Sequence, residues 1–215
     1  ARREVRPWMR QEADAGNADA WLTMAGMATS GRSLRRDPAA AIGYLERAAA
    51  LGQREASLTL GVRALVQGTP AQAVPHLRTT LGQDHTGRNG ALWLYLAQLR
   101  TGEPQAGPDL ATRFAAHDAW PRPVVDYFLG KTDGVKALAA ADTPGRACFA
   151  ANLIRLHEEA LGKAAATGLP KDCASLRDQY ASPGASASNP ICVPKSPDQT
   201  RRGQHISPIV NIGIS

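Results

Sequence analysis

Residues 17–52 read NADAWLTMAGMATSGRSLRRDPAAAIGYLERAAALG, and this stretch decides the fold class. It holds two apolar, alanine-rich runs separated by Gly31 and an arginine-rich joint, and it closes at Gly52. Glycine is favoured just after a helix because it adopts left-handed backbone angles that other residues avoid. The stretch therefore predicts two helices joined by a short connection.

The same pattern returns farther along the chain. Ala20 and Leu22 in the first apolar run correspond to Ala56 and Leu58 in a second copy, and Leu92 belongs to the matching run of a third copy. Within these runs the apolar residues recur at helical intervals rather than alternating as in a strand. Repetition of a helix pair is typical of proteins in which each pair packs on its neighbours. We therefore expect an all-α fold, and within that class an α-solenoid.

The boundaries of the expected helices carry their own signals. A glycine follows the first apolar run of each copy: Gly31, Gly68 and Gly102. A dipeptide ending in proline then begins the second run of each copy: Asp37-Pro38, Thr69-Pro70 and Glu103-Pro104. Proline is tolerated in the first turn of a helix, where its missing N–H would be unpaired in any case.

The first copy resembles a Sel1-like repeat, a relative of the tetratricopeptide repeat (TPR). The family pattern Gly, Asp, Ala, aromatic, Ala, Ala, Gly is matched by Gly31, Asp37, Ala41, Tyr44, Ala48, Ala49 and Gly52. Ala25 and Ala28 depart from the family's usual Gly and Tyr. The two following copies are similar to degenerate TPRs, and the resemblance covers roughly residues 17–165. It implies a right-handed superhelix of stacked antiparallel helix pairs.

The chain divides by composition into two parts. Residues 1–181 are expected to form the Sel1/TPR-like helical repeat domain. Residues 182–215 are rich in Ser, Pro and Gly and show no helical period, so they are expected to form a flexible tail.

The overall charge points to no particular ligand. The 215 residues carry a formal net charge of +6, but the arginines are scattered and no aromatic residues interleave with them. Nucleic-acid binding is therefore not expected, although a basic surface for nucleic acid or anionic lipid stays an alternative. No apolar run is long enough to form a transmembrane segment.

Motifs for catalysis and for metal binding are absent from the sequence. There is no Ser-x-x-Lys, no Cys-x-x-Cys and no pair of histidines at ligand spacing, so we expect no catalytic residue, no metal and no cofactor. The Sel1 resemblance nevertheless leaves an alternative open. A few relatives point to a cell-envelope enzyme, such as a cell-wall hydrolase, or to a β-lactam-binding protein.

The repeat pattern also assigns a surface. In stacked helix pairs the first helix of each pair lines the concave face, and Asp19 and Glu55 fall at polar positions of that face. The groove that we expect to bind a partner consists of Leu58, Val62, Leu65, Leu92, Leu96, Leu99 and Arg100. An apolar groove of this kind suits a peptide or an amphipathic helix, so the expected function is a non-enzymatic interaction scaffold.

Two alternatives to this groove remain. The same leucines could pack internally, against the segment around Val5 and Trp8 or against a helix within residues 146–165. They could also join two copies of the chain as a homodimer, since exposed apolar patches often mark such contacts.

The cysteines and the first residues bear on the compartment. Cys148 and Cys173 could form a disulfide in an oxidising environment, with buried or unreacted thiols as the alternative. The sequence begins without Met, and the resemblance is to repeat proteins of the bacterial envelope. These features favour the periplasm, with the cytoplasm as the alternative.

Overall fold

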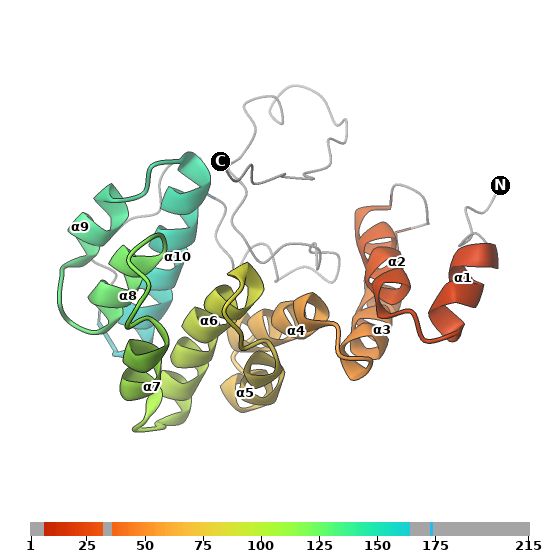
Figure 1. Ribbon diagram of the computed structural model, residues 1–215, viewed down its shortest axis with the longest axis horizontal. Coiled ribbons are helices and arrows are strands. Elements are labelled where there is room, and N and C mark those ends of the chain that lie inside the picture. The colour runs from red at the N-terminus through yellow and green to blue at the C-terminus, as the bar shows by residue number, and fades with distance from the viewer. Residues whose placement is uncertain (1–6, 32–35, 164–172, 174–215) are drawn as a thin grey trace.

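The computed structural model describes residues 7–31, 36–163 and 173. Within these ranges the chain forms ten α-helices and no strand, which confirms the all-α class (Figure 1). The predicted tail, residues 182–215, and the predicted end of the repeat domain at residue 181 lie outside the described residues.

The helices follow one another with short connections. Their bounds are α1 Pro7–Asp14, α2 Ala18–Ser30, α3 Pro38–Ala50, α4 Arg54–Val66, α5 Pro70–Thr79, α6 His85–Thr101, α7 Ala106–Arg113, α8 Arg122–Phe128, α9 Gly134–Ala139 and α10 Pro144–Ala160. None of these helices is both long enough and apolar enough to cross a membrane.

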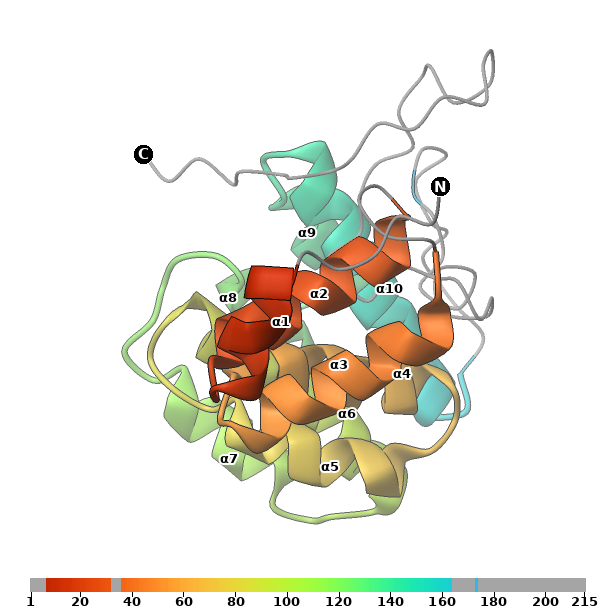
Figure 2. The same ribbon diagram turned by 90° about the vertical axis from the view of Figure 1, so that its right-hand side faces the viewer.

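Helices adjacent in sequence also pack against each other. This holds for every step from α1 to α9, and α10 then packs on α6, α8 and α9. Figure 1 shows the resulting row, with α1 to α3 at one end, α4 to α6 in the middle and α7 to α10 at the other end. Viewed from the N-terminal end in Figure 2, α1 to α3 lie in front of the remaining helices.

Several helix boundaries follow the sequence signals. Gly31 and Gly102 end α2 and α6 in the left-handed conformation, with φ of 69° and 75°. The Asp37 carboxylate accepts a hydrogen bond from the Ala40 N–H and so caps α3, in which Pro38 is the first residue. The expected start of a helix at Glu103-Pro104 is wrong, because α7 begins only at Ala106 and Pro104 lies in a turn.

The apolar side chains form two main clusters that meet at α4. Ala56 and Leu60 of α4 belong to the N-terminal cluster, together with Trp21 and Met24 of α2. Leu58 and the residues that share its face of α4 belong to a larger cluster, which continues through α5, α6, α8 and α10. Because α4 is buried on two sides, it joins the two clusters into one continuous row.

Candidate functional site

The apolar residues expected to line a concave groove are in the core. Leu58 is 4% exposed, and Val62, Leu65, Leu92 and Leu96 are fully enclosed. Leu99, the sixth, is partly buried and packs against the same cluster. The expectation of an open apolar groove is therefore corrected: these side chains belong to a buried cluster that also includes residues of α5 and α10, so they pack internally.

Arg100, the charged residue of the expected groove, connects helices. Its guanidinium donates a hydrogen bond to the Leu65 carbonyl oxygen at 3.3 Å and lies 3.5 Å from the Glu159 carboxylate. The Arg100 side chain is only 17% exposed. These contacts connect α6 to α4 and to α10, so Arg100 positions helices within the row.

An open cleft lies elsewhere, where α2, α4 and α6 begin. It has a volume of about 390 Å³ and is lined by Ala18, Asp19, Leu51, Gly52, Gln53, Arg54, Glu55, Asp84 and Thr86. We call it the helix-start cleft. Its lining is mostly polar, with the half-exposed Leu51 as the one large apolar side chain.

Each of the three helices begins at this cleft with a side-chain cap. Asn17 and Gln53 each accept two hydrogen bonds from N–H groups in the first turn of α2 and of α4, and Asp84 accepts one from the Gly87 N–H of α6. Such caps satisfy backbone donors that have no partner within the helix. The Gln53 amide also donates to the Asp19 carboxylate at 3.3 Å, which connects α2 to α4.

An arginine fixes the α6 side of the cleft. The Arg54 guanidinium donates two hydrogen bonds to the Asp84 carboxylate, at 2.9 and 2.7 Å, and its Nε donates to the Thr80 carbonyl oxygen at 3.1 Å. The hydrogen bonds from Arg54, followed by the one from the Gly87 N–H, lower the pKa of Asp84. The negative charge of Asp84 is thus matched within the structure.

The other two carboxylates of the cleft have no such match. Asp19 and Glu55 form no ion pair with any residue that the structure describes. Partial burial raises the pKa of Glu55, and the nearby charge of Asp19 raises it further. Glu55 remains accessible to solvent at the edge of the cleft, so a bound group could reach its carboxylate. Two neighbouring carboxylates without a cationic partner favour the binding of a cation between them.

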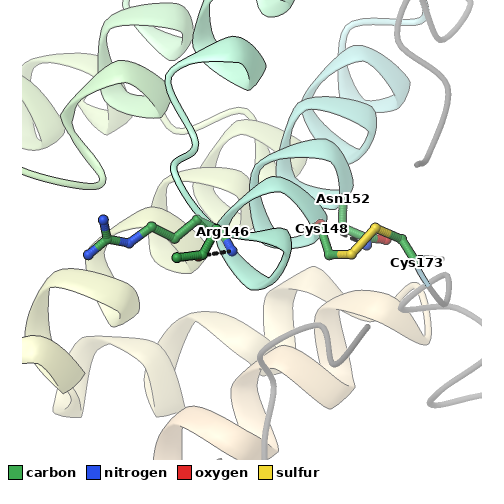
Figure 3. Close-up of a disulfide and its surroundings, with 5 residues drawn as sticks. Arg146, Cys148, Asn152 and Cys173 are labelled. Atoms are coloured by element: carbon green, nitrogen blue, oxygen red, sulfur yellow. Dashed lines mark hydrogen bonds between the residues drawn. A yellow bond between two sulfur atoms is a disulfide. The ribbon is translucent and has the colours of Figure 1, made fainter. Parts of the chain in front are cut away.

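A disulfide lies at the other end of the row. Cys148 of α10 is bonded to Cys173, and both belong to the larger apolar cluster. Figure 3 shows Cys173 beside Asn152, while Arg146 extends away from the bond. The Asn152 amide donates to the Cys148 carbonyl oxygen at 3.1 Å. The disulfide therefore holds residue 173 against α10.

Within the part of the chain that the structure describes, no group of three or more His, Cys, Asp or Glu side chains could hold a metal ion. Of the cleft residues, Asp19 and Glu55 are the two that the sequence predicts at polar positions of a concave face. Sequence reasoning missed Leu51, Arg54 and Asp84 as parts of a site. A cap signal precedes α6 at Asp84, but nothing local in the sequence pairs it with Arg54.

Comparison with known proteins identifies no relative of this chain. No protein-family model, no curated protein and no solved structure matches the chain.

Proposed function

We propose that this protein is a non-enzymatic scaffold that docks a protein or peptide partner, and that its helices form a Sel1/TPR-like α-solenoid. The left-handed glycines that end α2 and α6 and the successive packing of neighbouring helices support the solenoid. Stacked antiparallel pairs in a right-handed superhelix present long surfaces suited to binding extended segments.

We place the docking site at the helix-start cleft. The observation that carries this choice is the pair of unmatched carboxylates, Asp19 and Glu55, which face the same open cleft as Leu51. The partner segment then carries a lysine, an arginine or a free amino group next to an apolar side chain. Its cation pairs with the two carboxylates, and its apolar side chain covers Leu51, which is 49% exposed.

The energetics of Glu55 support binding over a purely structural role. When folding raises the pKa of a carboxyl group, the folded protein favours the protonated form. The negative charge of Glu55 therefore opposes folding at neutral pH. The pKa of Asp84 moves in the opposite direction, because its carboxylate already has Arg54 as a partner. A cation brought by a partner removes the repulsion and makes the charge of Glu55 favourable in the complex.

The disulfide supports a compartment for this function. Disulfides persist in oxidising environments and are rare in the reducing cytosol. The Cys148–Cys173 bond therefore supports the periplasm or a comparable oxidising space over the cytoplasm.

The test is a selection from a library of random short peptides displayed on a surface, with the folded protein as bait. We expect the selected peptides to share a Lys or Arg beside an apolar residue. Their affinity, measured by calorimetry, should fall about 10-fold in Asp19→Asn/Glu55→Gln.

The matched control is Asp109→Asn/Glu46→Gln, which removes an exposed first-turn acid of α7 and an exposed glutamate of α3. This variant should bind the selected peptides like the original protein. Equal affinity of all three proteins would show that the cleft is not the docking site. If no peptide is selected and the protein is a dimer in solution, a second copy of the chain becomes the better candidate partner.

A further inference from the structure

A histidine is enclosed in the core where α6, α8 and α10 meet. His157 of α10 is only 6% exposed. Its ring lies against three aromatic rings, with centroid distances of 4.8 Å to Phe128, 5.3 Å to Tyr127 and 5.7 Å to Tyr95. Three aromatic neighbours pack well against a neutral imidazole ring. They provide few hydrogen-bond acceptors for a protonated one.

We assign the proton of neutral His157 to Nε2, because a proton on the buried Nδ1 would have no acceptor among the described residues. The Tyr95 hydroxyl has one hydrogen, which it donates to the Phe128 carbonyl oxygen at 3.2 Å. The hydroxyl oxygen lies 3.0 Å from His157 Nε2, so it accepts a hydrogen bond from an Nε2–H group. Nδ1 then carries only a lone pair, and it has no hydrogen-bond partner among the described residues.

Protonation would convert that lone pair into a buried donor. An N–H group enclosed without an acceptor costs free energy, and a positive charge in an apolar enclosure costs more. The neutral tautomer avoids both penalties. The packing is therefore complementary to neutral histidine alone.

The charged and titratable groups near the ring do not offset this cost. Tyr95 from α6 already has its hydrogen bonds, and Tyr127 from α8 donates to the Glu158 carboxylate at 3.3 Å. Past the end of α10, Lys163 repels a second positive charge. The Asp133–Lys136 pair of α9, which also packs on α10, has both side chains more than half exposed.

Together, these surroundings favour the neutral form of the His157 ring over the protonated form. Burial, with a smaller contribution from Lys163, lowers the pKa of His157 from 6.5 to about 4. The folded protein thus excludes a proton that the unfolded chain would accept in mild acid.

We propose that His157 is an acid-sensitive latch that seats α10 against α6 and α8 and loosens when it is protonated. The apolar residues that α10 covers, such as Leu92 and Leu96, become accessible when α10 loosens, because they share one cluster with Leu153 and Ile154. Residue 173 moves with α10, since the disulfide joins it to Cys148. No residue that contacts His157 lines the helix-start cleft, so the inference does not rest on the docking proposal.

The test compares hydrogen–deuterium exchange of the α10 amides in the original protein and in His157→Phe. Phenylalanine keeps an aromatic ring in the enclosure and cannot titrate. Between neutral pH and about pH 4, the opening equilibrium of α10 should rise about 100-fold more in the original protein than in His157→Phe. Comparing the two proteins at each pH cancels the pH dependence of the chemical exchange step. His76→Gln, which changes a histidine of α5, should behave like the original protein.

Two results would overturn the latch. One is the same acid response in His157→Phe as in the original protein; the other is an equal rise in the exchange of α2 and α3, which would show unfolding of the whole chain. If His157→Phe does not fold, the pKa of the His157 ring in the original protein is measured by nuclear magnetic resonance. A titration midpoint near pH 4 supports the latch, and a midpoint above about pH 6 overturns it.

Discussion

The Arg54 guanidinium joins the first turn of α4 to the cap of α6 through two hydrogen bonds to the Asp84 carboxylate, at 2.9 and 2.7 Å. Together with its bond to the Thr80 carbonyl oxygen, this contact fixes the position of α6 relative to α4. The contact forms one side of the helix-start cleft and gives the Asp84 carboxylate a cationic partner.

Replacement of Arg54 by Met should weaken the fold modestly. The Arg54–Asp84 pair is partly exposed, with 36% and 56% of the side chains accessible, so the expected loss in the free energy of unfolding is about 1 kcal/mol. Urea denaturation at neutral pH measures it. Because Arg54 holds the pKa of Asp84 low, the part that depends on the Asp84 charge should be full above the unfolded-state pKa and disappear as the pH falls through the lowered value. A loss that is unchanged in acid would contradict this account.

Glu55→Gln should leave the protein at least as stable at neutral pH. The pKa of Glu55 is raised by partial burial and by Asp19, so its charge opposes folding above the folded-state pKa. Removing the charge relieves that opposition, and the difference should shrink as the pH falls through the raised pKa and vanish below the ordinary value of 4.5. Thermal unfolding of both proteins across the acid range provides the measurement. A lower midpoint for Glu55→Gln at neutral pH would show that the carboxylate stabilises the fold.

Leu96→Ala should destabilise the protein by roughly 2–5 kcal/mol, because Leu96 is fully enclosed and the substitution leaves a cavity. Leu51→Ala, at an exposed wall of the cleft, should change the free energy of unfolding by less than about 0.5 kcal/mol. Chemical denaturation of the two variants separates a core residue from a docking residue. Similar effects of both substitutions would refute the assignment of Leu96 to the core.

Gly90→Ala tests the contact between α5 and α6. A Cβ atom at Gly90 would lie 1.8 Å from Thr80 Oγ1 and 2.8 Å from Thr80 Cβ. The helices must separate to admit it, at an expected cost of about 1–3 kcal/mol. Gly43→Ala is the control, since nothing lies within 4 Å of its Cβ position in α3, and it should stabilise by roughly 0.5–1 kcal/mol. A neutral Gly90→Ala would mean that the two helices do not approach this closely.

The sequence is informative about helix ends because their chemistry is local. Gly31 and Gly102 adopt left-handed angles where helices stop, and Asp37 caps the helix that starts with Pro38. These signals depend only on neighbouring residues, so they can be read without knowledge of the fold.

Which helices pack against each other cannot be predicted from such local signals. The spacing of Leu92 and Leu96 identifies helical side chains, but it does not decide between an open groove and packing against the helix that the structure shows as α10. For the same reason the pairing of Arg54 with Asp84, and of Tyr95 with His157, is invisible in the sequence. Each pair joins helices that are far apart in the chain, and only the packing of those helices brings them together.

The central claim, a docking site for a cation at the helix-start cleft, is tested most directly by a double-mutant cycle. Calorimetry gives the affinity of a selected peptide and of its Lys→Ala or Arg→Ala form for the original protein and for Glu55→Gln. We predict a coupling energy of about 1 kcal/mol between Glu55 and the peptide cation. A coupling energy near zero, with peptide binding intact, would show that the cation does not pair with Glu55 and would contradict the proposed site.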